Sequence, residues 1–286
     1  MEIRAIDTHC HPSTSEYLEG SFGPVLQNTR KHFKSKINIR SVDEMADEYR
    51  SQGIIACVSG FDAELSMGTP ATPNDLIAEM MQRHPDVFIG MAGIDPNKGD
   101  EAIRELERCI KELGLKGVGE LRPICQKFYP NDKKLYPFYE KCVELGVHVP
   151  FHTGTTGVGS GLPGGGGFCI DYSRPIYIDY LAADFPELNI ICCHPSIPWV
   201  DEELAVVTHK GNVHMDISGW HPRFLSEHLL SRLNRDLQDK VMFGTDYPWI
   251  TPKKWLSGFE KLPVEDGVKK KVLKDNAIRI MHLDVG

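Results

Sequence analysis

A single repeating unit governs what this chain can fold into: a short apolar segment, a turn and an amphipathic helix. The unit recurs along the whole sequence, and several of its helices end at a glycine, such as Gly114 and Gly146. Short apolar strands that alternate with helices predict a parallel sheet, and eight of them favour closure into an α/β barrel, the (β/α)8 TIM barrel. No linker divides residues 1–286, so we expect a single domain. The predicted strands are 3–12, 53–60, 87–95, 115–121, 147–154, 189–196, 212–219 and 240–249.

Predicted helices fill most of the intervals between these strands. Ser41 and Glu44 have the spacing of a capping box, which starts the first helix. Two other intervals differ, because 13–40 is polar and weakly patterned and 155–167 is rich in glycine. We expect both to be loops over a site, with the backbone amides of the second as an alternative anion site. The predicted helices are 41–51, 73–84, 100–113, 133–145, 174–184, 201–210, 222–237 and 264–281, with another beginning at Pro252.

Charge and cysteine content narrow the class of protein. A net charge of -8 and a pI of about 5.8 argue against a nucleic-acid binder, although a nuclease that holds phosphates through metal ions stays open. The sequence has neither an apolar run of about 18 residues nor an apolar N-terminal leader, so we expect no membrane partner. The eight cysteines form no Cys-x-x-Cys pair, which favours a reduced, cytoplasmic protein.

Side chains that bind metals follow the predicted strands, at their carboxyl ends. Active-site residues of (β/α)8 barrels stand at these ends. His9 and His11 end the first strand about 7 Å apart, and a slight bend would let both hold one cation. Structural histidines would not fall at strand ends so consistently, so the pattern favours a metal centre. The other candidates are Glu120 on the fourth strand, His152 on the fifth, His194 on the sixth and Asp246 on the eighth.

Four motifs in this order resemble the amidohydrolase superfamily: Asp-Thr-His-Cys-His at 7–11, Phe-His-Thr-Gly at 151–154, Cys-His-Pro-Ser at 193–196 and Phe-Gly-Thr-Asp-Tyr-Pro-Trp at 243–249. They are most similar to the amidohydrolase-related group, which includes aminocarboxymuconate-semialdehyde-type decarboxylases and related metal-dependent hydrolases. The resemblance implies that His194 is a catalytic acid/base or a ligand of a second ion. The metal ligands that it implies are His9, His11, His152 and Asp246.

The fourth strand leaves the number of ions open. Two-metal members of the superfamily often bridge their ions with a carboxylated lysine or a glutamate at this position. Lys116 lies roughly 13 Å deeper than Glu120, and Gly-Val-Gly-Glu resembles the glutamate of the metal-dependent deoxyribonuclease branch. An ion pair between Glu120 and Arg122 is the structural alternative. We therefore expect one zinc or manganese ion and leave a second open.

This residue set predicts a divalent-metal-dependent hydrolase of a small amide, ester, lactone or thioester, using metal-activated water. Asp246 would be both a ligand and the general base, and His194 would protonate the leaving group. One alternative is the non-oxidative decarboxylation of an aryl or muconate-type acid, in which His194 protonates the substrate carbon. A phosphodiesterase and a metal-free barrel that binds a small acid are further alternatives.

Residues just beyond the strand ends are candidates for binding the small-molecule substrate. Arg122 could pair with a substrate carboxylate, and Tyr247 and Trp220 could line an aryl pocket, although rim packing explains the aromatic residues equally well. Histidines away from strand ends, such as His32, are predicted to be surface or structural residues. The sequence leaves a homo-oligomer open.

Overall fold

Parallel strands form the centre of the structure, a computed structural model that describes residues 2–34 and 37–285. The strands pair in two groups, in the orders β1-β2-β3 and β4-β5-β6-β7. Each strand lies within a range predicted from the sequence. The strands are β1 (Ala5–Cys10), β2 (Ile54–Ser59), β3 (Phe88–Met91), β4 (Val149–His152), β5 (Ile190–Cys193), β6 (Val213–Asp216) and β7 (Val241–Met242).

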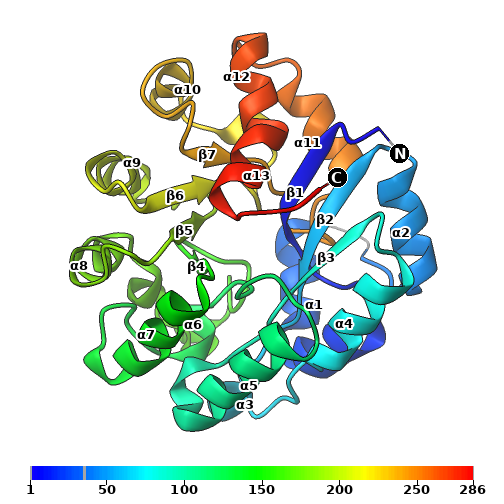
Figure 1. The fold of residues 1–286 in the computed structure, drawn as a ribbon, viewed down its shortest axis with the longest axis vertical. Coiled ribbons are helices and arrows are strands. Elements are labelled where there is room, and N and C mark those ends of the chain that lie inside the picture. Colours follow the sequence, from blue (N-terminus) through cyan, green and yellow to red (C-terminus); the bar gives the residue numbers. More distant parts are fainter. Residues whose placement is uncertain (1, 35–36, 286) are drawn as a thin grey trace.

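Two further extended segments close these groups into a barrel. Residues 116–121 lie between β3 and β4 and form backbone bridges to both sides. Residues 243–247 continue β7 and bond to β1, where Tyr247 pairs in parallel with Cys10. Residues 116–121 occupy the place of the predicted fourth strand, and β7 with its continuation that of the eighth, so the fold is an α/β (β/α)8 TIM barrel (Figure 1).

Helices surround the barrel (Figure 1), and most lie where the sequence predicts them. The capping box is present: the Ser41 hydroxyl accepts from the Glu44 amide, and the Glu44 carboxylate accepts from the Ser41 amide. The predicted helix 222–237 is broken into shorter pieces, whereas 264–281 is helical from 266 to 280 with a π-helical stretch, Lys271–Asp275, between two α-helical parts. The helices are α1 (Gly23–Phe33), α2 (Val42–Arg50), α3 (Glu64–Met67), α4 (Asn74–Arg83), α5 (Asp100–Lys111), α6 (Pro123–Gln126), α7 (Tyr136–Leu145), α8 (Ile176–Asp184), α9 (Val200–His209), α10 (Glu227–Leu233), α11 (Pro252–Phe259), α12 (Asp266–Lys270) and α13 (Asn276–Ile280).

The prediction of a loop at 13–40 is wrong for most of that range. A π-helical turn, Glu16–Ser21, leads into α1, and only 35–36 lie outside the described residues. Glycines at 20 and 23 and a short apolar stripe hide the helical period in the sequence.

Three apolar clusters pack the barrel, its helices and its two ends. The largest lies between the strands and the surrounding helices. A second lies beyond the carboxyl ends of the strands, where residues of α1 pack with Phe61 and Trp249. The third lies at the opposite end, where Ile280 and Met281 pack against barrel residues such as Ile191. The C-terminal segment therefore covers the end of the barrel that is opposite to α1.

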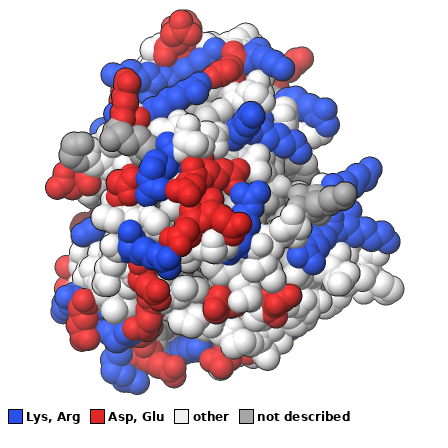
Figure 2. Space-filling view, turned by 90° about the vertical axis from the view of Figure 1, so that its right-hand side faces the viewer, with Lys and Arg blue, Asp and Glu red and all other residues white. Residues whose placement is uncertain are grey.

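Charged side chains near α2 lie in mixed groups. Arg50 pairs with Asp86 at 2.7 Å and with Asp47 at 2.8 Å, and Arg83 pairs with Asp43. Basic side chains accordingly stand beside acidic ones on this side of the molecule (Figure 2). None of the helices in the described ranges is both long and apolar enough to cross a membrane.

Candidate metal centre and active site

The two histidines of the first strand meet at the carboxyl end of β1. The pairing of β1 with β2 is irregular between Asp7 and Cys10. The Nε2 atoms of His9 and His11 lie only 3.3 Å apart, and both rings are buried. Asp7 instead accepts a hydrogen bond of 2.9 Å from the Thr245 amide. The strand thus has the bend that a shared cation requires, and Asp7 takes no part in it.

The hydrogen bonds of these two rings determine which nitrogen atoms are free. Nδ1 of His9 lies 3.1 Å from Oδ2 of Asp216, and Nδ1 of His11 lies 3.1 Å from the carbonyl oxygen of Ser59. Because a carboxylate and a carbonyl only accept, each Nδ1 carries a proton, and each neutral ring presents a lone pair at Nε2. Two converging imidazole lone pairs are typical of a metal centre.

Two carboxylates complete this donor group. Oδ1 of Asp246 lies 3.5 Å from Nε2 of His11 and 3.8 Å from Nε2 of His9, and Oε2 of Glu120 lies 3.5 Å from each. Ligands bound at about 2.1 Å to one ion stand about 3.0 to 3.4 Å apart. The donor atoms of His9, His11 and Asp246 lie within 4.8 Å of one another, as ligands of one divalent cation would, and Glu120 adjoins both histidines. These four residues are here called the metal-donor group.

Neighbouring carboxylates favour a positive charge on the His9 ring. Burial alone would lower the pKa of His9, but the carboxylates of Glu120 and Asp216 raise it well above its usual value. The same carboxylates would favour a bound cation.

A second donor group shares Glu120. Oε1 of Glu120 lies 2.9 Å from Nδ1 of His152 and 3.1 Å from Nε2 of His194, and these two nitrogen atoms are 3.0 Å apart. Nε2 of His152 is buried and has no hydrogen-bond partner within the part of the chain that the structure describes. His152, which the resemblance places with the other ligands, thus lies in this second group, and Glu120 faces both groups.

Arg122 contacts two atoms of the metal-donor group. Its Nε pairs with Oε2 of Glu120, and its Nη2 lies 2.6 Å from Nε2 of His11 and 3.1 Å from the Tyr17 hydroxyl. Burial would raise the pKa of Glu120, but Arg122 and His9 hold it well below its usual range. The predicted ion pair is therefore present together with the contacts of Glu120 to the histidines.

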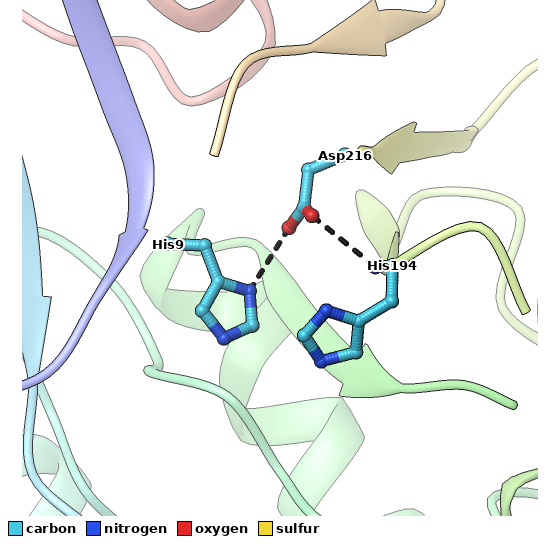
Figure 3. Close-up of side chains that lie close together, drawn as sticks. All are labelled: His9, His194 and Asp216. Atoms are coloured by element: carbon cyan, nitrogen blue, oxygen red, sulfur yellow. Dashed lines mark hydrogen bonds and ion pairs between the residues drawn. The ribbon is translucent and has the colours of Figure 1, made fainter. Parts of the chain in front are cut away.

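Asp216 at the end of β6 links the two donor groups, and the sequence prediction missed it (Figure 3). Besides His9, its carboxylate accepts from the backbone amides of His194 at 3.2 Å and Ser218 at 2.9 Å. The Ser218 hydroxyl also lies 2.8 Å from Nδ1 of His194. Burial would raise the pKa of Asp216, but His9 lowers it, so the carboxylate is ionised. Its position at a strand end was the signal that could have found it.

A cavity of about 530 Å³ opens beside these groups, and His194 and Asp246 contribute to its lining. Residues 155–158 and α1 also line it, so parts of both segments predicted to lie over the site do so. His32, predicted to be a surface or structural residue, lines the cavity because it lies on α1. The aromatic lining consists of Phe22, Phe33, Trp220, Phe224 and Trp249.

The two aromatic residues predicted to bind substrate have different positions. Trp220 lines the cavity, as predicted. The placement of Tyr247 is corrected: its ring packs against Tyr49 with centroids 5.5 Å apart, and its hydroxyl lies 3.3 Å from Glu48. Tyr247 therefore points toward α2, away from the cavity that Asp246 lines.

Curated relatives of the chain include two decarboxylases. The chain is 23% identical over 324 aligned residues to gamma-resorcylate decarboxylase of Polaromonas sp. (strain JS666), an alignment that covers 96% of the chain and 97% of that relative. It is 37% identical over 79 residues to 2-amino-3-carboxymuconate-6-semialdehyde decarboxylase of Dictyostelium discoideum. That second alignment covers 28% of the chain and only 22% of the relative.

Similar solved structures share the barrel. A TIM-barrel protein of Bordetella bronchiseptica has a TM-score of 0.78 at 24% identity, covering 97% of the chain and 98% of its own. Dihydroxybenzoic acid decarboxylase of Polaromonas sp. JS666, with bound manganese and the inhibitor 2-nitroresorcinol, has a TM-score of 0.71 at 22% identity, covering 99% and 98%. A probable 2-pyrone-4,6-dicarboxylic acid hydrolase of Acinetobacter baumannii with bound citric acid has a TM-score of 0.65 at 14% identity, covering 98% and 100%.

The family described as Amidohydrolase matches residues 6–283 of the sequence. This range includes both donor groups and every strand after the first residue of β1. The chain thus belongs to the amidohydrolase family and is an enzyme of the amidohydrolase superfamily.

Proposed function

We propose that the chain is a divalent-metal-dependent enzyme that removes carbon dioxide, without oxidation, from a small hydroxyaryl or muconate-type acid. The observation that carries this proposal is the metal-donor group beside a cavity with aromatic walls. A flat acid suits such walls, and its carboxylate and neighbouring hydroxyl are oxygen ligands for a divalent cation. The end-to-end alignment with a decarboxylase supports decarboxylation over the hydrolysis that the sequence favoured.

His9, His11, Asp246 and Glu120 would hold the cation. Mixed imidazole and carboxylate donors suit zinc or manganese, and a similar decarboxylase structure contains manganese. When bound, the cation supplies Lewis-acid chemistry, since it binds oxygen atoms of the acid and stabilises negative charge there.

His194 is placed to carry the proton that replaces carbon dioxide. Its Nε2 lies 3.1 Å from a Glu120 carboxylate oxygen, and the Ser218 hydroxyl at Nδ1 orients the ring. His194 gives its proton to the carbon that bears the carboxylate, and a C–H bond forms. The C–C bond then breaks, its electron pair returns to the conjugated system, and carbon dioxide leaves. Solvent restores the proton of His194.

The cavity walls orient the acid and limit the access of water. Phe22 precedes α1 and Phe33 ends it, and both pack against Trp249 at the rim after residue 247. Trp220 lies on another part of the wall. An aromatic acid between such side chains keeps its carboxyl end at the donor groups, where the reacting carboxylate is less exposed to bulk water.

The test is a comparison of two substrate panels with metal-loaded protein. Hydroxybenzoates and muconate-type acids are assayed for carbon dioxide release, and esters, lactones and thioesters are assayed for hydrolysis. We expect turnover of an acid in the first panel, and its loss in a His194→Gln variant that keeps its metal. Turnover restricted to the second panel would show that the proposed reaction is wrong.

A hydrolase is the second candidate, and one observation favours it. Glu120 faces both donor groups, as a carboxylate that bridges two ions would. In that reaction Asp246 would accept the proton of the attacking water, and His194 would protonate the leaving group. Two ions per chain together with ester or lactone hydrolysis would select this function.

A further inference from the structure

We propose that the rim of the cavity contains a second anion subsite, formed by Arg223, Lys254 and His221, which binds a carboxylate far from the metal-donor group. The inference rests on the proposed function and specifies its substrate class: an aryl or dienoic acid with two carboxylates, one at each end of the cavity.

The three residues come from two segments that pack against each other. His221 and Arg223 follow β6, and Lys254 lies on α11. A Cβ added to Gly258 would lie 2.7 Å from Cε1 of His221, so the His221 ring rests directly on α11. Because residues four apart share one face of a helix, Lys254 lies one turn from that ring. All three of His221, Arg223 and Lys254 line the same cavity as His194.

Hydrogen bonds and aromatic contacts position two of the donors. The Arg223 amide donates to Nδ1 of His221 at 3.3 Å, so a neutral His221 ring carries its proton on Nε2. The Arg223 guanidinium carbon lies 4.5 Å from the centre of the Phe224 ring, a cation–π contact. Phe224 is 52% exposed, so this contact holds the guanidinium at the mouth of the cavity rather than at its floor.

Among the described residues, Arg223 and Lys254 lack the carboxylate neighbours that some other basic residues of the surface, such as Arg50, have. Across the described ranges, no carboxylate oxygen lies within 4.0 Å of the charged nitrogen atoms of Arg223 or Lys254. Arg50, in contrast, pairs with Asp86 near α2. In a chain with a net charge of -8, two unpaired cations beside one cavity favour a bound anion.

The charge of the cavity differs between its floor and its rim. Its carboxylates are Glu120 and Asp246, and both belong to the metal-donor group. At the rim, burial and then the charges of Arg223, Lys254 and Lys261 lower the pKa of His221, because positive charge converges there. A dianionic acid would thus have one carboxylate at the cation and the other at the rim, with its apolar part between the aromatic walls.

The test uses Arg223→Gln, Lys254→Gln and the double variant, with Lys253→Gln as a matched control. Lys253 is an exposed neighbour on α11 that does not line the cavity. Each protein is assayed with pairs of aryl acids that differ only in a second carboxylate remote from the reacting one. We expect the double variant to raise KM for the diacid about 10- to 100-fold, with kcat little changed. KM for the monoacid, and both constants of Lys253→Gln, should match those of the unaltered enzyme.

Equilibrium binding separates this proposal from the proposed function. Benzene-1,3-dicarboxylate and benzoate are titrated into metal-loaded protein by calorimetry, which needs no turnover. We expect tighter binding of the dicarboxylate, and loss of that difference in the double variant. If this pattern appears but no acid releases carbon dioxide, the subsite stands and the proposed function fails. If carbon dioxide is released but the double variant keeps the same difference in affinity between diacid and monoacid as the unaltered enzyme, the subsite is overturned and the proposed function stands.

Discussion

Individual hydrogen bonds decide what the histidines of this site can do. The backbone carbonyl of Ser59 and the carboxylate of Asp216 fix the Nδ1 protons of His11 and His9, and the Nε2 lone pairs then converge. The sequence predicted that both histidines converge, because alternate side chains of a strand share a face and a slight bend brings them together. It could not predict the tautomers, since these depend on partners far away along the chain.

Removal of the charge of Asp216 should weaken metal binding. We expect Asp216→Asn to lower metal affinity about 10- to 100-fold, because the carboxylate orients His9 and increases its basicity. Competition with a chelator of known affinity measures the change. Asp284→Asn, at an exposed position, is the control, and equal affinities of the two variants would contradict this role.

The two histidines of the second donor group should differ in their effects. His152→Ala should reduce both metal content and activity, since His152 contacts Glu120 and has a free buried nitrogen. His194→Ala should abolish turnover and leave at least one ion bound. Metal analysis together with steady-state rates distinguishes the two, and full activity of either variant would refute its assigned role.

Among the structural elements, the extended segment 116–121 is tightly constrained by its neighbours. A Cβ at Gly117 would lie 2.3 Å from Cε1 of His148, and a Cβ at Gly119 would lie 2.4 Å from Cβ of Ser59. These close approaches explain why glycine precedes Glu120 in this segment, and they hold the carboxylate at the rim between neighbouring strands.

Gly117→Ala should destabilise the fold by about 1 to 3 kcal/mol, because the added methyl overlaps the buried His148 ring. Gly211→Ala is the matched control: in the described structure nothing lies within 4 Å of its Cβ position, so its free energy of unfolding should change by less than about 0.5 kcal/mol. Denaturant unfolding measures both, and similar losses in the two variants would argue against this packing constraint.

Elements with a clear period were predictable from the sequence, and those positioned by tertiary contacts were not. The capping box at Ser41 is a local signal, and it marks the start of α2 correctly. In α1, the buried positions Val25, Leu26 and Thr29 face residues distant in sequence, and the surrounding glycines mask the period. The error at Tyr247 has a similar origin, because a strand end fixes a residue's height in the barrel but not the side to which it points.

At the scale of the whole molecule, buried histidines should make stability depend on pH. Burial lowers the pKa of His148 to about 4, while the unfolded chain has about 6.5. Between these values the unfolded state binds more protons, so the free energy of unfolding falls as pH falls, by up to about 1.4 kcal/mol per pH unit. In chelator-treated protein, His148→Gln should show a shallower slope between these pH values. An unchanged slope would contradict the assignment.

Metal removal should lower the stability of the entire barrel. The metal-donor group joins β1, in the three-stranded group, to residues 116–121 and 243–247 at the two junctions between the sheets. A ligand at 1,000 times its dissociation constant stabilises the folded state by about 4 kcal/mol. Thermal unfolding before and after chelation should therefore show a lower transition temperature, restored by manganese or zinc. A transition temperature that neither falls on chelation nor rises when metal is restored would contradict a metal centre in the folded state.

The C-terminal segment closes one end of the barrel, which affects how substrate enters and how products leave. In the described residues, Ile280, Met281 and Leu283 pack into that end, and the large cavity lies at the other. A substrate that enters past α1 therefore reaches a dead end, and the products retrace its route. For the proposed reaction, carbon dioxide leaves first while the larger aromatic product still occupies the cavity. That product should therefore act as a competitive inhibitor of the acid substrate.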